Sequence, residues 1–365
     1  EGNGNRDGFD HDAILETRVD PDDVVLPPYF PNTQTMRELY ARYYDLITVF
    51  DRKVGEHLQE LEEAGLLENT VVFVFSDHGF GLPRYKRWLY RTGLRVPLVL
   101  HVPEAYRDQF AAAPGQREDL VSFLDFAPTV LDLAGVPQPK TMTGQSFLSE
   151  TYKKPFVYGA RSRADDVNTI GRAIVDERYI YIRNFTPSRP YFERAVIFGA
   201  DKQGSYRELH RLRDTGELNP EAAAFWQPRP AEELYDLVAD PHELHNIAQD
   251  PAHRATLQRL RGQLSSTVRE SRDVGFLHES EFMRRAAQTG QTVFEYAKSQ
   301  AYDLEAIYGA AEKVGREEVA TSELLAPLES PDSGVRFWGV IALAQRPEAA
   351  QRSAAQLESV LHDPS

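Results

Sequence analysis

The longest regular pattern of apolar positions lies in residues 36–61. These positions recur at spacings of three and four, in the order Met36, Leu39, Tyr43, Ile47, Phe50, Val54, Leu58 and Leu61. Such spacing places the side chains on one face of an α-helix. Thr33 or Thr35 can cap the start of this helix, and Gly65 can end it. The sequence therefore predicts a long amphipathic helix between these residues.

Two short apolar runs follow this helix, and they have the composition of buried strands. Residues 71–75 are five consecutive apolar residues, and residues 96–102 form a second run. Residues 120–134 again show helical spacing and end at a glycine. The order helix, strand, loop, strand, helix is typical of α/β proteins. We expect residues 1–150 to hold part of a mostly parallel, doubly wound sheet, because they contain too few strands for a whole one.

From residue 151 the pattern changes to short strands separated by turns. Residues 151–275 are therefore expected to form a small antiparallel α+β subdomain that includes a helix over residues 252–269. The candidate strands are residues 156–159, 170–175, 179–184 and 233–237. His242 and His245 lie in a turn between the last strand and this helix, where we interpret them as turn and cap residues.

Residues 276–365 are predicted to be entirely helical. Residues 322–328 and 335–344 form a candidate helix pair, and residues 356–365 repeat the pattern of the first helix and its turn. This repetition is typical of HEAT-type repeats, whose stacked helices present binding surfaces to protein partners. An ordinary helical tail remains the alternative.

Composition and charge exclude several classes of function. The chain has 365 residues, 41% hydrophobic and 27% charged, which favours a soluble globular protein of two or three domains. Its formal net charge of -15 argues against non-specific binding to nucleic acid. The absence of cysteine excludes disulfides, thiolate metal sites and a cysteine nucleophile. No apolar run approaches about 18 residues, so no membrane span is expected.

Candidate chemistry is concentrated directly after residues 71–75. Asp77 and His78 follow this run, and glycines 79 and 81 let the loop bend sharply. A carboxylate and an imidazole on neighbouring residues can bind one divalent cation, and Lys86 adds a positive charge nearby. Asp and His are also common as turn and cap residues, which is the alternative interpretation of this pair.

The same stretch resembles the sulfatases of the alkaline phosphatase superfamily. The resemblance begins with Leu-Glu-Asn-Thr-Val-Val-Phe-Val-Phe-Ser-Asp-His-Gly at residues 67–79 and continues through Lys86 to Leu-Tyr-Arg-Thr-Gly-Leu-Arg-Val-Pro at residues 89–97. It extends through residues 125–137 and 233–246. Val-Leu-Pro-Pro-Tyr-Phe-Pro-Asn-Thr at residues 25–33 is similar to the heparan N-sulfatase (sulfamidase) branch. Altogether the resemblance covers roughly residues 1–270.

This resemblance implies roles for individual residues. Asp77 matches a metal-ligating carboxylate, and His78 matches the adjacent ligand, where many sulfatases carry asparagine. Lys86 matches the lysine that contacts the sulfate oxygens and assists the leaving group. Further candidates for substrate binding are Arg84, beside this lysine, and a group in a turn of the second subdomain: Arg161, Arg163 and Asp165.

The nucleophile of the family is absent from this chain. Sulfatases use a formylglycine made from Cys or Ser in a Cys/Ser-x-Pro-Ser/Ala-Arg motif, and two further aspartate ligands accompany it. Phe185-Thr-Pro-Ser-Arg189 keeps the last three motif residues, but phenylalanine cannot become an aldehyde, so this match is attributed to chance. We therefore expect the chain to be the C-terminal portion of a sulfatase whose formylglycine lies upstream, and to be inactive alone.

The implied cofactor is a divalent metal. The family favours Ca²⁺, while the imidazole of His78 suits Mn²⁺ or Zn²⁺. The implied substrate is a sulfated small molecule or sulfated glycan carrying a sulfate ester or a sulfamate, and the family suggests a periplasmic or secreted location. Two alternatives stay open: a phosphonate or phosphodiester hydrolase of the same superfamily, and an inactive scaffold that binds a protein partner through its helical tail.

Overall fold

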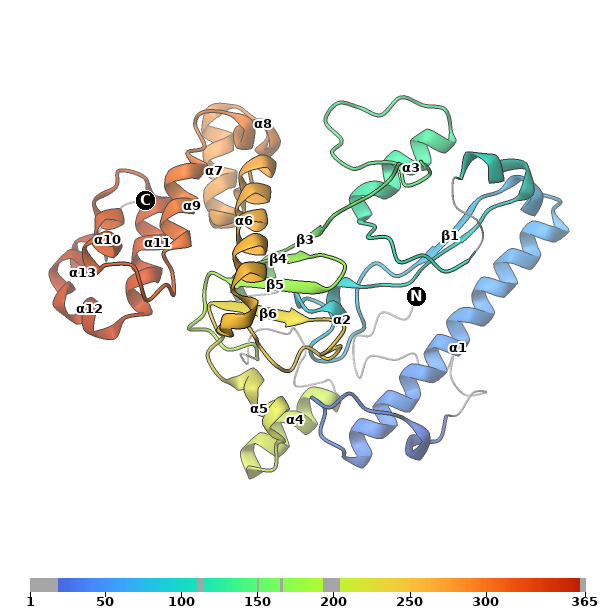
Figure 1. Ribbon diagram of the computed structural model, residues 1–365, viewed down its shortest axis with the longest axis horizontal. Helices are drawn as coiled ribbons and strands as arrows, with labels where there is room; N and C mark the ends of the chain where they lie inside the picture. Colours follow the sequence, from blue (N-terminus) through green and yellow to red (C-terminus); the bar gives the residue numbers. More distant parts are fainter. Residues whose placement is uncertain (1–18, 111–114, 150, 165–166, 193–203, 362–365) are drawn as a thin grey trace. The chain divides into compact units, whose positions relative to one another are not determined.

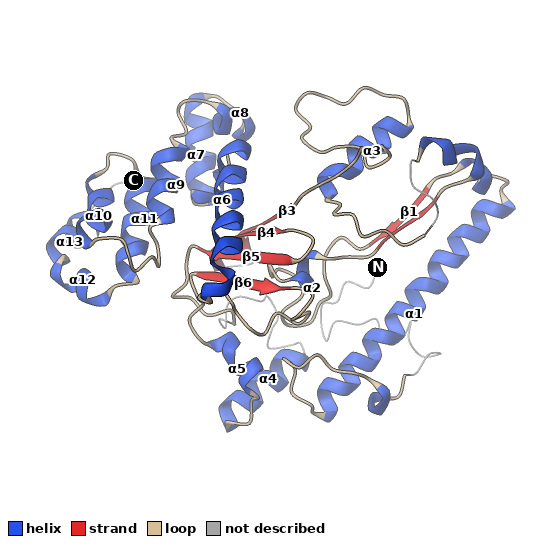
Figure 2. Ribbon diagram, viewed as in Figure 1, coloured by secondary structure: helices blue, strands red, loops and turns tan. Residues whose placement is uncertain are grey.

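The computed structural model describes residues 19–110, 115–149, 151–164, 167–192 and 204–361. The chain divides into two compact units (Figure 1). Unit 1 comprises residues 1–157, 175–179 and 199–219, and unit 2 comprises residues 158–174, 180–198 and 220–365. Both units mix helices with strands, so the fold is of the mixed α/β kind (Figure 2). Within the described ranges, no helix has both the length and the apolarity that crossing a membrane requires.

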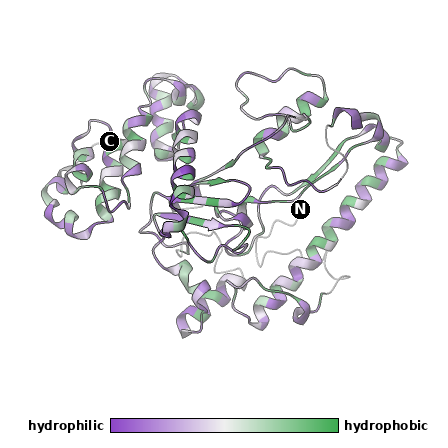
Figure 3. Cartoon of the chain, in the orientation of Figure 1, coloured by the Kyte–Doolittle hydropathy of each residue, from purple (hydrophilic) through white to green (hydrophobic). Residues whose placement is uncertain are grey.

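The longest helix of unit 1 is α1, Gln34–Glu63, as the apolar spacing predicts. The Thr33 side chain accepts a hydrogen bond from the Met36 amide at 3.3 Å, and this cap fixes the first turn. Gly65, with φ of +68°, follows the last turn and lets the chain leave the helix. Polar and apolar residues alternate along α1 (Figure 3). The apolar face is buried only in the first half, as far as Val49, and Phe50 beyond it is 50% exposed.

Two strands of unit 1 form a pair, and one expectation about them is wrong. β1, Val72–Phe75, pairs with β2, Leu98–His101, in an antiparallel register. We expected these strands to belong to a mostly parallel sheet. Parallel neighbours need a crossover connection that returns the chain to the starting end, usually through a helix. Residues 76–97 contain only the four-residue helix α2, Arg91–Leu94, and the chain returns in the opposite direction.

The remaining helices of unit 1 are short. Helix α3, Phe126–Leu133, starts later than predicted because the 3₁₀ turn Phe123–Asp125, which a capping box between Ser122 and Asp125 begins, precedes it. Asp125 is fully buried and binds Lys154 at 3.0 Å. Helix α4, Gly204–Thr215, packs against α1. The 3₁₀ turns of this unit are Pro21–Asp23, Leu67–Asn69, Glu104–Gln109 and Phe123–Asp125.

Unit 2 is built on a four-stranded sheet with the strand order β3-β4-β5-β6. The strands lie close to the predicted positions: β3 Val157–Ala164, β4 Val167–Val175, β5 Tyr179–Asn184 and β6 Glu232–Asp236. β4 and β5 are joined by a tight turn in which the Asp176 amide donates to the Tyr179 carbonyl at 3.0 Å. So short a connection joins antiparallel neighbours. Phe185, directly after β5, is a fully buried core residue.

The rest of unit 2 is helical, as predicted for the C-terminal part of the chain. Helix α11, Ser333–Ala344, packs against α9, Leu304–Glu312. Trp338 of α11 is fully buried, and its indole N–H donates to the Phe276 carbonyl at 2.9 Å. The HEAT-type interpretation of these helices stays a prediction. The helices are α5 Pro220–Ala223, α6 Arg254–Ser271, α7 Glu279–Thr289, α8 Val293–Lys298, α9 Leu304–Glu312, α10 Thr321–Leu325, α11 Ser333–Ala344, α12 Pro347–Arg352 and α13 Ala354–Leu361. The 3₁₀ turns are Ala224–Trp226, Pro251–His253, Val274–Phe276 and Ala326–Glu329.

Two buried arginines tie the sheet of unit 2 to its helices. Arg172 of β4 is 1% exposed and binds the Asp273 carboxylate, which follows α6, at 2.6 Å. The Tyr158 hydroxyl of β3 donates to the same carboxylate at 2.7 Å. Arg183 of β5 donates to the carbonyls of Glu312, at 3.2 Å, and of Val314, both at the end of α9. Arg172 is thus neutralised by a carboxylate, whereas Arg183 is held by backbone carbonyls.

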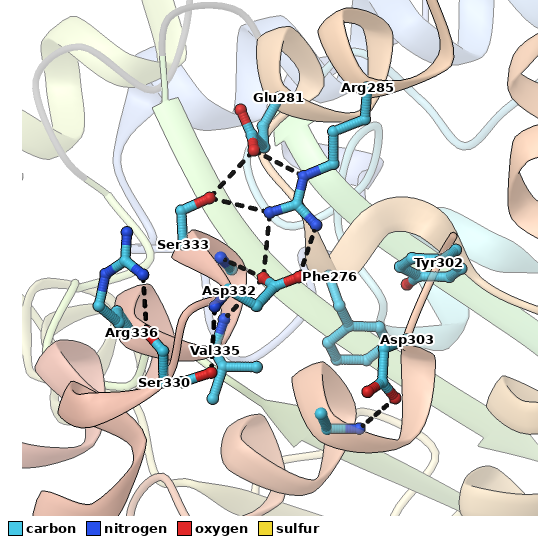
Figure 4. A network of polar contacts seen from close by, with 12 residues as sticks. Phe276, Glu281, Arg285, Tyr302, Asp303, Ser330, Asp332, Ser333, Val335 and Arg336 are labelled. Atoms are coloured by element: carbon cyan, nitrogen blue, oxygen red, sulfur yellow. Dashed lines mark hydrogen bonds and ion pairs between the residues drawn. The ribbon is translucent and has the colours of Figure 1, made fainter. Parts of the chain in front are cut away.

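A network of charged side chains joins α7 to the start of α11 (Figure 4). Arg285 binds Glu281 at 2.6 Å and Asp332 at 2.8 Å. Asp332 also caps α11 by accepting the Gly334 amide at 2.7 Å. The Ser333 hydroxyl donates to Glu281 at 3.0 Å. The network therefore fixes the N-terminus of α11 against α7.

This network predicts a loss of stability in acid. Burial opposes ionisation of Glu281, but hydrogen bonds from Arg284, Arg285 and Ser333 outweigh it and lower its pKa from 4.5 to about 2. A carboxylate whose folded pKa is depressed stabilises the fold above its unfolded pKa, so this contribution disappears as the pH falls from 4.5 toward 2. Circular dichroism at 222 nm across this range should show helix loss. The variant Glu281→Gln should be less stable at pH 7 and should lose less stability on acidification. Equal acid dependence in both proteins would contradict the prediction.

Candidate functional site

The candidate metal ligands lie on the loop that follows β1. The His78 Nε2 and Asp77 Oδ2 atoms are 3.2 Å apart, and their side chains are 40% and 78% exposed. His78 Nδ1 lies 2.8 Å from the Gly79 carbonyl oxygen. A carbonyl oxygen only accepts, so Nδ1 carries the proton of this hydrogen bond. In the neutral imidazole, the Nε2 lone pair therefore faces the aspartate oxygen.

This arrangement fits a cation between the two side chains. Two lone-pair atoms at 3.2 Å need a shared proton or a metal ion to offset their repulsion. A metal-binding histidine usually donates its other N–H to a carbonyl or carboxylate, which fixes the tautomer and the ring orientation. His78 meets this condition through Gly79. Across the described ranges, no three His, Asp or Glu side chains converge as a metal cluster, so the pair supplies only part of a coordination shell.

A close contact between two glycines holds the ends of the loop together. The Gly79 amide lies 3.4 Å from the Gly93 carbonyl oxygen. A Cβ atom at Gly79 would lie 2.1 Å from the Thr92 carbonyl oxygen, and one at Gly93 would lie 2.3 Å from that of Trp88. Larger residues at either position would push the backbone segments apart. The glycines therefore set the width of the loop that carries His78.

Lys86 lies half-buried on this loop, and its backbone is tied to the same segment. Its amide donates to the Phe80 carbonyl at 2.8 Å. The structure thus places Asp77, His78 and Lys86 on one loop of unit 1, directly after β1, where the sequence predicts them.

Arg84, a predicted substrate contact, is 2% exposed. Its guanidinium carbon lies 4.4 Å from the centre of the Tyr29 ring and 4.1 Å from that of Tyr90. A cation between two aromatic faces gains electrostatic attraction from both rings. These contacts place the side chain within the packing of the loop, and its role in substrate binding stays a prediction.

The other predicted substrate contacts belong to unit 2. The Arg161 carbonyl accepts a hydrogen bond from Arg172 at 2.7 Å, and Arg161 itself is 8% exposed. Arg163 forms an exposed ion pair with Glu279 at 3.0 Å. Asp165 lies outside the described residues. Arg161 and Arg163 belong to unit 2 and the loop after β1 belongs to unit 1, so each is described within its own unit.

Sequence reasoning missed a cluster of tyrosines around the loop. The hydroxyls of Tyr40 and Tyr85 are 2.6 Å apart, and the Tyr29 hydroxyl donates to that of Tyr85 at 3.2 Å. Tyr40 is 4% exposed and belongs to the core of unit 1. The only signal for the hydroxyl contacts was the position of Tyr85 beside Lys86. The partners come from segments 45 and 56 residues away, which periodicity does not connect.

The candidate site thus consists of a strand followed by a loop that carries an aspartate, a histidine and a lysine. Comparison with known proteins shows which proteins share this sequence. The sequence model of the sulfatase family matches residues 12–136. An ulvan-active sulfatase of Formosa agariphila is 36% identical over 263 residues, which cover 71% of this chain and 43% of that protein. The human N-sulphoglucosamine sulphohydrolase is 31% identical over 268 residues, which cover 70% and 52%.

A solved structure agrees at the level of the fold. YidJ from Bacteroides fragilis aligns with a TM-score of 0.52 and 20% sequence identity, covering 73% of this chain and 51% of that one. Together, the matches show that residues 12–136 fit the sulfatase family model and that the chain is similar to sulfatases over most of its length. The chain spans about half the length of the curated relatives it matches.

Proposed function

We propose that this chain carries part of the active site of a metal-dependent hydrolase of sulfate esters or sulfamates. The observation that carries the proposal is the 3.2 Å approach of His78 Nε2 to Asp77 Oδ2 while Nδ1 is held by the Gly79 carbonyl. This geometry leaves a carboxylate oxygen and an imidazole nitrogen facing one point, where a divalent cation can bind. The similarity of the chain to sulfatases supports the same assignment.

Under this proposal, Asp77 and His78 are two ligands of a divalent metal. The family favours Ca²⁺, and the nitrogen ligand also suits Mn²⁺ or Zn²⁺. When bound, such an ion stabilises the negative charge that develops on the sulfate oxygens. The Asp77 carboxylate would offset part of the positive charge of the ion. The His78 imidazole would bind the ion in an orientation that its hydrogen bond to the Gly79 carbonyl fixes.

Lys86 is the proposed contact to the sulfate group. Its ammonium carries three N–H donors and a compact charge, which suit the oxygens of a sulfate ester and of a departing oxyanion. Arg84, Arg161, Arg163 and Asp165 remain proposed substrate contacts. No residue here is proposed as the nucleophile, because the 365 residues contain no cysteine and no Ser-x-Pro-x-Arg segment. We propose that a formylglycine outside these residues completes the site.

The proposed substrate is a sulfated glycan or a sulfated small molecule. One relative carries the name ulvan-active sulfatase, and another the name N-sulphoglucosamine sulphohydrolase. The second name denotes a sulfated glucosamine as the substrate of that relative. Residues 25–33, which resemble the sulfamidase branch, favour a sulfamate among these substrates. A protein partner for the helical part of unit 2 is a further proposal, which rests on its repeat-like sequence.

A direct comparison of substrates tests the proposed function. The natural protein that carries this chain should hydrolyse p-nitrophenyl sulfate faster than bis-p-nitrophenyl phosphate, and a chelator should lower the rate. The 365-residue chain alone should give no turnover, since it lacks the nucleophile. Elemental analysis of the purified natural protein should find a divalent metal that is lost in the variant Asp77→Asn. Asp119→Asn, an exposed change elsewhere in unit 1, should retain the metal.

The alternatives give different results in these measurements. Faster hydrolysis of the phosphodiester would favour the phosphonate or phosphodiester hydrolase. A natural protein without any Cys/Ser-x-Pro-x-Arg segment and without turnover would favour the binding scaffold. Turnover of p-nitrophenyl sulfate by the 365-residue chain alone would contradict the proposal that the nucleophile lies outside it.

A further inference from the structure

The backbone beside Lys86 adopts an unfavourable conformation on both sides. Arg84 has φ of +72° and Arg87 has φ of +79°, which are left-handed values that residues with a Cβ atom rarely adopt. Each such residue is strained, so the surrounding structure must hold the turn in place. Lys86 lies between these two residues. Its position therefore depends on contacts that its neighbours make.

One set of contacts holds Arg84 in place. Its guanidinium lies between the rings of Tyr29 and Tyr90, and its carbonyl accepts a hydrogen bond from the Thr92 hydroxyl at 2.7 Å. The side chain is 2% exposed, so water contributes little to these interactions. Both the side chain and the backbone of Arg84 are thereby held in one orientation.

A second set of contacts holds Tyr85, the residue directly before Lys86, in place. Its hydroxyl lies 2.6 Å from that of Tyr40 on α1 and 3.2 Å from that of Tyr29. Burial raises the pKa of Tyr40 far above its ordinary value, and the neighbouring Tyr85 adds to this effect. The Tyr40 hydroxyl therefore stays protonated at neutral pH. The three hydroxyls form a chain that ties the loop to α1 and to the segment before it.

We propose that Tyr85, held by the hydroxyls of Tyr40 and Tyr29, is a positioning residue that fixes Lys86 for its contact with sulfate. This inference rests on the proposed function of Lys86. A lysine side chain has a flexible four-carbon stem, so its ammonium is directed mainly by the place from which that stem starts. Small displacements of a reacting or stabilising group lower rates strongly. The three tyrosine hydroxyls are thus part of the site, because they hold the loop from which the Lys86 side chain extends.

Removing single hydroxyls tests the proposal without removing the rings. Tyr85→Phe and Tyr40→Phe each break the chain. Tyr44→Phe is the matched control, because the Tyr44 ring lies 6.0 Å from that of Tyr40 on the same helix but its hydroxyl takes no part in the chain. Amide hydrogen exchange of the chain should show the Lys86 amide, which is bonded to Phe80, exchanging about five- to tenfold faster in the first two variants. The control should leave this rate unchanged.

Kinetics of the natural protein separate positioning from a general loss of stability. Tyr85→Phe should lower kcat for p-nitrophenyl sulfate by roughly 10- to 100-fold, with KM changed less than threefold, because the substrate still binds while the ammonium is displaced. Its melting temperature should lie only a few degrees below that of Tyr44→Phe, so that both variants are folded at the assay temperature.

Three results would overturn the proposal. The first is an unchanged exchange rate of the Lys86 amide in both Tyr85→Phe and Tyr40→Phe. The second is faster exchange with an unchanged kcat in a protein where Lys86→Ala abolishes turnover, which would reject positioning but keep the role of Lys86. The third is full turnover by Lys86→Ala, which would reject the sulfate contact itself and the positioning role with it.

Discussion

Replacing Lys86 by alanine is expected to lower kcat of the natural protein for p-nitrophenyl sulfate by roughly 10²–10³-fold. The magnitude follows from the usual effect of removing one donor that stabilises charge in a transition state. The Lys86 ammonium is the proposed partner of the sulfate oxygens and of the departing oxyanion, so its loss should affect kcat more than KM. Initial rates over a range of substrate concentrations separate the two constants.

Lys53 provides the control for this prediction. It lies exposed on α1, and Lys53→Ala removes the same charge from unit 1 without touching the loop after β1. The control variant should retain kcat within a factor of two. Addition of a small primary amine should partly restore the rate of Lys86→Ala, because a free ammonium can occupy the space that the substitution opens. A kcat loss in Lys86→Ala no larger than in the control would refute the assignment.

The second large effect is expected from Asp273→Ala, which should lower the free energy of unfolding by about 3–5 kcal/mol. The substitution leaves the Arg172 guanidinium, 1% exposed, buried without its carboxylate. Losing one partner of a buried pair is costly because the remaining charge stays out of water. Urea denaturation followed by tryptophan fluorescence measures the change, since Trp338 lies in the core of the same unit.

An exposed pair with the same chemistry supplies the comparison. Arg117 Nε and Asp119 Oδ2 are 2.7 Å apart, close to the 2.6 Å of the buried pair, but their side chains are 41% and 37% exposed. Asp119→Ala should therefore lower stability by less than about 1 kcal/mol. The double variant Arg172→Met with Asp273→Leu should be more stable than Asp273→Ala, because it leaves no buried charge. Similar losses from Asp273→Ala and Asp119→Ala would contradict this account.

Local features of the fold followed from the sequence with good precision. Thr33 and Gly65 mark the ends of α1 because capping and helix termination are decided by a few adjacent residues. The four strands of unit 2 were found because their turns and alternation are also local. The antiparallel return from β1 to β2 was not found, because strand direction depends on how residues 76–97 fold in space.

The candidate site also has local features that the sequence predicts and long-range contacts that it does not. Asp77 and His78 are neighbours in the chain, so a motif can identify them. The burial of Arg84 between two tyrosine rings could not be predicted, since charged residues are usually exposed and Tyr29 comes from a distant segment. Similarly, Asp273 pairs with an arginine 101 residues away, and no local pattern shows the contact. Long-range polar contacts were therefore the main part of the molecule that sequence reasoning left open.

The contacts of Arg183 set a limit on how far this protein can be shortened. Its side chain is 2% exposed, and among its acceptors are the carbonyls of Glu312 and Val314. A chain that ends before Glu312 would remove both acceptors from a guanidinium on β5, an interior strand of the sheet, where burial already lowers the Arg183 pKa. The shortest fragment that folds should therefore extend past this point. The helices up to α9 therefore belong to the same folding unit as the sheet, although they contain no strands.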